Sequence, residues 1–199
     1  MAGGTPVNWW FDPLSHAYYL NGQQIVSVTQ ALTLGGRIDA RWFTPEARER
    51  GLRVHRHCEL YDISLRDHVQ VQQPEDDVSA EVEAYRAFVH DYRPRWTHIE
   101  QGFVHEFEVY GGRPDRVGLI LRLGEKGTVE IKTGAEYDWH GLQLAGYQGL
   151  NPSGSRWVLY LGKNGKYKFI RCKRAADYAD FRHALAGARA IVEGGGVAI

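Results

Sequence analysis

The sequence has few cysteines, no net charge and no long apolar run, and each absence excludes a class of protein. Only Cys58 and Cys172 occur among 199 residues, too few for a disulfide framework or for the four thiolates of an iron–sulphur cluster. No apolar stretch approaches the roughly 18 residues of a membrane span, and the first residues lack the basic and apolar regions of a signal peptide. We therefore expect a protein of the reducing cytoplasm with no membrane partner.

Opposite charges cancel over the whole chain. The 24 basic and 24 acidic residues leave no net charge, so the composition gives no support for nucleic-acid binding. Positive charge is densest in one segment, at Arg37, Arg41, Arg48, Arg50, Arg53 and Arg56. A nucleic-acid partner would have to bind local positive charge of this kind.

Turn signals and apolar periodicity predict an α/β fold, in which a mixed central β-sheet is flanked by helices. Asn21-Gly22 indicates a short hairpin, which leads into a helix capped near Ser27 or Thr29, and Thr44-Pro45 indicates the start of another helix. The predicted later helices span about 44–60, 78–92, 140–149 and 175–192, and the predicted strands span about 98–110 with a break, 113–123, 128–133, 157–161 and 166–172. The length suits a single domain, 1–199. Within that domain, we expect an N-terminal segment of a hairpin and helices, about 1–95, to pack on a catalytic core of about 96–199.

Charged residues lie within two of the predicted strands. Glu130 and Lys132 share one face of a strand, while apolar residues occupy the other face. The glycine-containing segment 124–127 can turn the chain back, so Asp115 can approach Glu130 from the neighbouring strand. Two carboxylates that close repel each other unless a cation lies between them, and a hard ion such as Mg²⁺ takes oxygen ligands. With Lys132 beside them to stabilise developing charge, these residues predict metal-assisted phosphodiester hydrolysis.

Four motifs resemble one family of nucleases. Pro114-Asp115, a gap and then Glu130-Ile131-Lys132 resemble the PD-(D/E)XK signature in its literal form. Three further stretches resemble the branch that contains the RecB nuclease domain and phage-type exonucleases. They are the GxxxHxxxE pattern of 51–59, the QxxxY pattern of 143–147 and the opening segment FDPLSHAYYLNGQQIVSVTQAL. Order and spacing agree from about Trp10 to Lys173.

The resemblance implies a role for each residue of the signature. Asp115 and Glu130 resemble the metal-binding carboxylates, and the carbonyl of Ile131 is a further oxygen ligand. Lys132 resembles the catalytic lysine that positions or activates the attacking water. His55 resembles the histidine that reaches the metal from a helix, although a histidine taken alone is more often structural.

Four other residues match positions whose role is less specific. Gln143 and Tyr147, one helical turn apart, resemble residues that contact DNA or orient the site. Taken without the resemblance, Gln143 is an ordinary polar helix residue and Tyr147 an amphipathic core residue. Glu59 and Glu106 match weaker acidic positions, and either can reach a second metal ion.

The resemblance also implies a function. It points to a DNA exonuclease that takes part in recombination, repair or phage DNA processing. Such an enzyme uses one or two Mg²⁺ or Mn²⁺ ions and no iron–sulphur cluster. The expected location is the cytoplasm, or the host cytoplasm if a phage encodes the protein. DNA is the implied partner, and a single-strand annealing or recombination protein is a further candidate. Because fold and metal site do not fix substrate geometry, two alternatives stay open: a structure-specific endonuclease, and a non-catalytic DNA-binding or assembly module. The sequence also leaves open the polarity, the strand preference, the processivity and the choice between monomer and ring.

Overall fold

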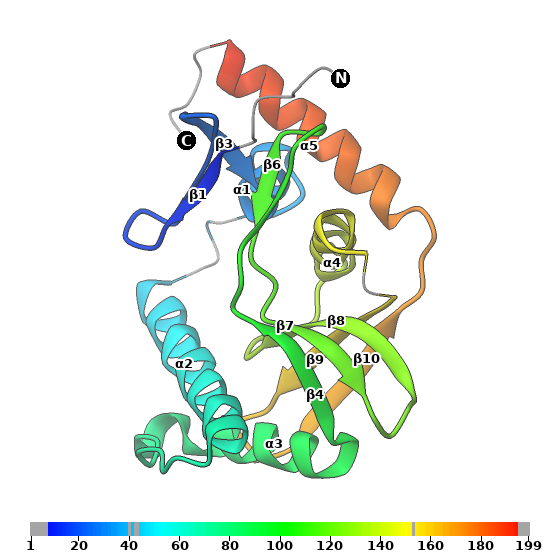
Figure 1. Cartoon of the computed structure of the whole chain (residues 1–199). Helices are drawn as coiled ribbons and strands as arrows, with labels where there is room; N and C mark the ends of the chain where they lie inside the picture. The colour runs from blue at the N-terminus through cyan, green and yellow to red at the C-terminus, as the bar shows by residue number, and fades with distance from the viewer. Residues whose placement is uncertain (1–7, 40, 42–43, 153, 195–199) are drawn as a thin grey trace.

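The computed structural model describes residues 8–39, 41, 44–152 and 154–194 (Figure 1). The elements follow in the order β1 (Trp9–Asp12), β2 (Ala17–Leu20), β3 (Gln23–Ser27), α1 (Val28–Leu34), α2 (Pro45–Asp67), α3 (Asp76–Tyr92), β4 (Pro94–Ile99), β5 (Phe103–His105), β6 (Tyr110–Gly112), β7 (Arg116–Ile120), β8 (Glu125–Lys132), α4 (Trp139–Leu150), β9 (Ser155–Leu161), β10 (Tyr167–Cys172) and α5 (Asp177–Glu193). Within this part of the chain, no helix is both long and apolar enough to cross a membrane.

The larger sheet is mixed and has the strand order β10-β9-β8-β7-β4. Its centre, β8, pairs antiparallel with β7 and parallel with β9. A parallel pair needs a crossover connection, and α4 provides it between β8 and β9. The helices α3 and α4 lie on opposite sides of this sheet (Figure 1). The predicted α/β fold with a mixed, helix-flanked sheet is confirmed.

The two faces of β8 have different environments, as the alternation of its residues predicts. Val129 and Ile131 are fully buried in a core that they share with Val54 of α2 and Phe88 of α3. Burial of a side chain of this size contributes roughly 1.5–3 kcal/mol to stability. The opposite face carries Glu130 towards α4, so the apolar face anchors the strand and leaves the charged face for chemistry.

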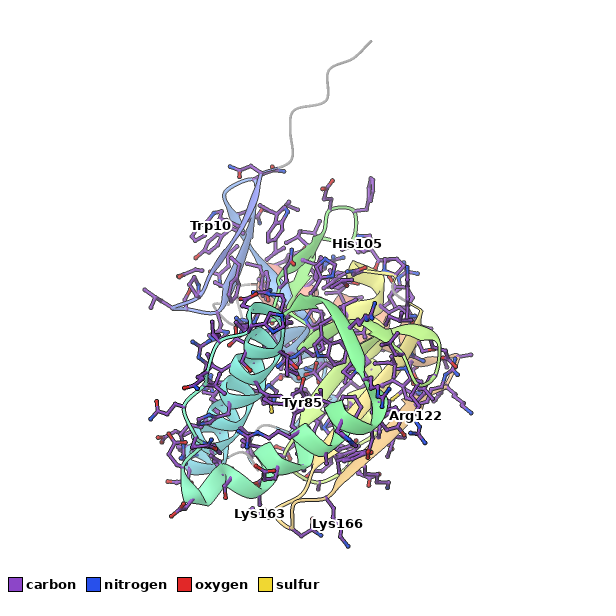
Figure 2. The ribbon with its side chains drawn as sticks, turned by 60° about the horizontal axis from the view of Figure 1, so that its bottom comes forward. Trp10, Tyr85, His105, Arg122, Lys163 and Lys166 are labelled. Carbon is purple, nitrogen blue, oxygen red and sulfur yellow. The ribbon has the colours of Figure 1, made fainter. Side chains whose placement is uncertain are left out.

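The smaller sheet has the strand order β1-β2-β3-β6-β5 and contains the N-terminal hairpin. Asn21 and Gly22 turn the chain between β2 and β3 with φ of 51° and 82°, the left-handed conformations that a two-residue hairpin turn needs. Trp10 on β1 and the β9–β10 turn, with Lys163 and Lys166, lie at opposite ends of the molecule (Figure 2). The hairpin is tied to the rest of the chain because β3 pairs with β6. The division of the domain near residue 95 stays a prediction.

Two predicted boundaries are wrong, and the error at the end of α2 has a tertiary cause. The helix predicted to end near residue 60 continues to Asp67, since Asp62 is buried against α3 and accepts a hydrogen bond of 2.5 Å from Tyr85 Oη. The strand predicted over 98–110 with a break begins earlier, at Pro94, and the chain is broken as expected, into β4, β5 and β6. The first break falls at Glu100, whose φ of 47° cannot continue a strand.

Candidate metal centre

Three side chains able to bind a metal ion converge from three separate segments. His55 lies in α2, Glu100 in the turn between β4 and β5, and Asp115 immediately before β7. His55 Nδ1 is 3.3 Å from Asp115 Oδ1 and 3.9 Å from Glu100 Oε1. One ligand atom from each residue lies within 4.8 Å of the others, a spacing that a single ion can bridge.

Glu100 is a member of this group that the sequence analysis missed. The pairing of Ile99 with Arg116 places it beside Asp115, and its backbone N–H donates to the Asp115 carbonyl at 3.0 Å. Arg116 Nη1 lies 3.1 Å from Glu100 Oε1, and Arg113 Nε lies 3.4 Å from Glu100 Oε2. A left-handed conformation in a residue other than glycine costs about 1–3 kcal/mol, and these contacts hold Glu100 in it. Local sequence gives no sign of Glu100, because its place depends on strand register.

Asp115 is fixed by the backbone of the neighbouring strand. Its Oδ2 accepts a hydrogen bond of 2.6 Å from the Ile131 N–H. In an extended strand the N–H and C=O of one residue point to the same side, so the Ile131 carbonyl also points to the edge that Asp115 occupies. This direction suits the expected role of the Ile131 carbonyl as an oxygen ligand.

Glu130 provides the observation that tests whether the residues fit a metal ion. It is only 4% exposed, and its Oε1 accepts from Lys132 Nζ at 3.0 Å. Its Oε2 is buried and has no hydrogen-bond partner among the described residues. Leaving a buried charged oxygen unpaired is expensive, and a divalent cation would remove that cost. The imidazole of His55 with the carboxylates of Glu100 and Asp115 is a donor set that Mg²⁺ or Mn²⁺ accepts, and Glu130 lines the same cavity without belonging to that group.

The pKa values of the group reflect its crowded charge. Burial lowers the pKa of His55, but attraction to the carboxylates of Asp115 and Glu100 outweighs burial and raises it to about 10. Burial raises the pKa of Asp115, but the charge of His55 overcomes this and lowers it to about 2. Burial and the Asp115 charge raise the pKa of Glu130 to about 7, against the opposing effect of Lys132. The metal-free group therefore holds protons that a bound cation would displace.

Gln143 and Tyr147 of α4 hold the lysine in place. Lys132 Nζ donates to Gln143 Oε1 at 2.8 Å, and Gln143 Nε2 donates to the Tyr147 hydroxyl at 3.0 Å. The Trp139 ring centre lies 5.1 Å from the same ammonium nitrogen. Gln143 is 4% exposed and Tyr147 5% exposed, so most of what each side chain touches is protein. Their expected contact with DNA stays a prediction, whereas the contact of Gln143 with Lys132 is present.

The two weaker acidic candidates have different positions. A cavity of about 670 Å³, here called the acidic cavity, is lined by Glu59 together with His55, Glu100, Asp115, Glu130 and Tyr147. Glu59 accepts a hydrogen bond of 2.6 Å from Arg56 Nη1, so it is already paired. Glu106 is exposed in the turn after β5 and does not line this cavity. The structure does not bring Glu106 to the metal-binding group, and Glu100 supplies the acidic residue instead.

Comparison with known proteins gives a likeness of fold. No protein-family model matches the chain, and no curated protein matches it either. The crystal structure of an alkaline exonuclease, LHK-Exo from Laribacter hongkongensis, is 12% identical, with 86% of this chain and 89% of that chain covered and a TM-score of 0.51. The same enzyme in complex with dAMP is 13% identical over the same shares of the two chains, with a TM-score of 0.49. A structure of SSO0001 is 14% identical over 83% of this chain and 75% of that chain, with a TM-score of 0.46. The likeness to the first of these structures shows that this chain shares its fold.

Proposed function

We propose that this chain is a divalent-metal-dependent nuclease that hydrolyses phosphodiester bonds in DNA, and that it acts as an exonuclease. The observation that carries the proposal is the convergence of His55, Glu100 and Asp115 beside a buried Glu130 oxygen without a partner. The shared fold with an alkaline exonuclease supports the same reaction class. DNA recombination, repair or phage DNA processing in the cytoplasm is the setting that such an activity suits.

The metal-binding residues are His55, Glu100, Asp115, Glu130 and the carbonyl of Ile131, which together would hold one or two ions. A divalent cation bound there polarises the scissile phosphate and lowers the pKa of the attacking water. These residues come from a helix, from the turn between β4 and β5, from the position before β7 and from β8, so the fold itself brings them together. An imidazole ligand favours transition ions, so we expect Mn²⁺ to support activity at least as well as Mg²⁺.

Lys132 is placed to act on the water or the phosphate. Its ammonium group has three N–H donors, and two of them are used, by Glu130 Oε1 and by Gln143 Oε1. The third can donate to the attacking water or to a phosphate oxygen, where it stabilises the charge that develops during hydrolysis. Gln143 and Glu130 thus fix the direction of the remaining donor.

The test is an incubation of circular and linear DNA with EDTA, Mg²⁺ or Mn²⁺, with the Asp115→Asn protein as the control for contaminating activity. We expect metal-dependent loss of linear DNA and survival of covalently closed circles. Cleavage of both forms would support the endonuclease in place of the exonuclease. If neither form changes with either metal, the nuclease proposal is wrong and the non-catalytic DNA-binding module is favoured.

A further inference from the structure

Arg48 differs from the other arginines of α2. Four of those have a carboxylate partner, in the pairs Arg50–Glu81, Arg53–Asp77, Arg56–Glu59 and Arg66–Asp67. Arg48 is exposed and, in the part of the chain that the structure describes, forms no ion pair. Burial and the charge of Arg113 lower the pKa of His16, and the charge of Arg48 contributes; His16 and Arg48 both line the acidic cavity. The guanidinium therefore brings unneutralised positive charge to the mouth of the metal centre.

A second cavity, of about 610 Å³, lies beyond the metal centre and is here called the aromatic cavity. The two cavities share Thr29, Arg48 and His55 in their walls, so they meet at the candidate metal centre. The apolar side chains of the aromatic cavity are Ile38, Ala47, Ile131, Ala135, Tyr137 and Trp139. These apolar side chains suit the flat and largely apolar surface of a nucleobase, while Arg48 in the same wall suits a phosphate.

Tyr137 offers the surface on which a base can stack. It lies in the connection between β8 and α4, and half of its surface, 50%, is exposed. Its ring is nearly parallel to that of Trp139, with an angle of 16° and a centroid distance of 6.2 Å. Lys132 Nζ lies 5.1 Å from the centre of the Trp139 ring. The aromatic pair thus begins next to the catalytic lysine and ends at an exposed ring.

We propose that the aromatic cavity receives an unpaired nucleobase adjacent to the scissile phosphate, stacked on Tyr137, while Arg48 binds the neighbouring phosphate. This inference rests on the proposed function and names its substrate class, a single strand or a frayed end. A paired base cannot enter, because its partner strand would have to enter the same cavity. Stacking on an aromatic side chain does not depend on which base is present. The site therefore selects single strands over duplexes and accepts any base sequence.

Binding to DNA tests the inference without any reliance on cleavage. Fluorescence anisotropy measures the affinity of a labelled oligothymidylate and of a blunt duplex, in EDTA and again in Ca²⁺, over a series of salt concentrations. The variants are Tyr137→Ala, Tyr137→Phe and Arg48→Ala. The matched controls are Phe107→Ala, at an aromatic residue that is 91% exposed on the β5–β6 turn, and Arg122→Ala, on the β7–β8 turn (Figure 2).

We expect Tyr137→Ala to weaken binding of the single strand by about five- to 100-fold, with little change for the duplex. Tyr137→Phe keeps the ring and should bind as the unmodified protein does. Arg48→Ala should weaken binding and reduce the slope of log affinity against log salt by about 0.7, the value for one phosphate contact on a single strand. Both controls should have no effect. Circular dichroism checks that every variant is folded.

Several results would overturn the inference. One is that Tyr137→Ala and Arg48→Ala bind the single strand as tightly as the unmodified protein does. Another is that the substitutions reduce the affinity for single strand and duplex equally. A third is that the unmodified protein binds no DNA in either EDTA or Ca²⁺. Failure of the base-stacking site and failure of the proposed nuclease function would give different results. A protein that binds single strands through Tyr137 and Arg48 but hydrolyses nothing would refute the nuclease alone. A metal-dependent nuclease that is indifferent to both substitutions would refute only the base-stacking site.

Discussion

Replacement of Glu130 by glutamine should stabilise the metal-free protein and remove its response to metal. The pKa of Glu130 in the folded protein is about 7, against an ordinary 4.5. A folded-state pKa above the unfolded value means that the unfolded chain releases its proton first, so stability falls as pH rises from about 4.5 to 7 and then levels off. At about 1.4 kcal/mol per pKa unit, the loss is about 3 kcal/mol. Glutamine mimics the protonated acid and avoids this loss.

Urea denaturation in EDTA at pH 5, 7 and 9 measures the effect. The Glu130→Gln protein should differ little from the unmodified protein at pH 5 and should be more stable by about 3 kcal/mol at pH 9. Addition of Mn²⁺ at about 1,000 times its dissociation constant should reverse the order, because that concentration stabilises the protein that binds the ion by about 4.1 kcal/mol. A stability difference that does not vary with pH, or equal stabilisation of both proteins by Mn²⁺, would refute the placement of Glu130 in the metal centre.

Three further predictions concern the neighbours of Glu130. Asp115→Asn and Lys132→Ala should each abolish hydrolysis, but calorimetry should show that only Asp115→Asn loses Mn²⁺ binding; the reverse pattern would exchange their roles. His55, whose pKa is about 10, must lose a proton before it can bind a metal ion, so Mn²⁺ affinity should rise up to tenfold per pH unit between about pH 7 and 9. The His55→Ala protein should bind Mn²⁺ more weakly, and its slope of log affinity against pH should be smaller by about one. Gln143→Ala should bind Mn²⁺ normally and lower kcat, with KM nearly unchanged; if metal binding falls instead, Gln143 does more than orient Lys132.

Local signals in the sequence were enough to predict most elements. Thr44 Oγ1 accepts from the Ala47 N–H at 3.1 Å and Pro45 opens the helix, because an N-cap and its proline act within one turn. The Asn21-Gly22 turn is local in the same way. The end of α2 is not local, since Asp62 is held by a side chain of α3, and no signal near residue 60 reveals that partner.

Helical spacing alone could not define the role of α4. A separation of four residues correctly places Gln143 and Tyr147 on one face. Whether that face meets solvent, DNA or protein depends on how α4 packs on β8, and the structure directs Gln143 to Lys132. The functional role of Gln143 stays a prediction, and the packing of α4 on β8 is what brings its side chain to Lys132.

The buried charges of the candidate metal centre give a physical reason why a cation would stabilise it. Fully buried Arg116 contacts Asp62 at 2.6 Å and Glu100 at 3.1 Å, so one guanidinium supports two carboxylates. Lys132 supports one oxygen of Glu130. Asp115 depends on His55, which attracts it strongly only in the protonated form. A divalent ion bound in place of this proton would add one positive charge beside Asp115 and Glu100. Metal binding at this centre would therefore be coupled to release of a proton.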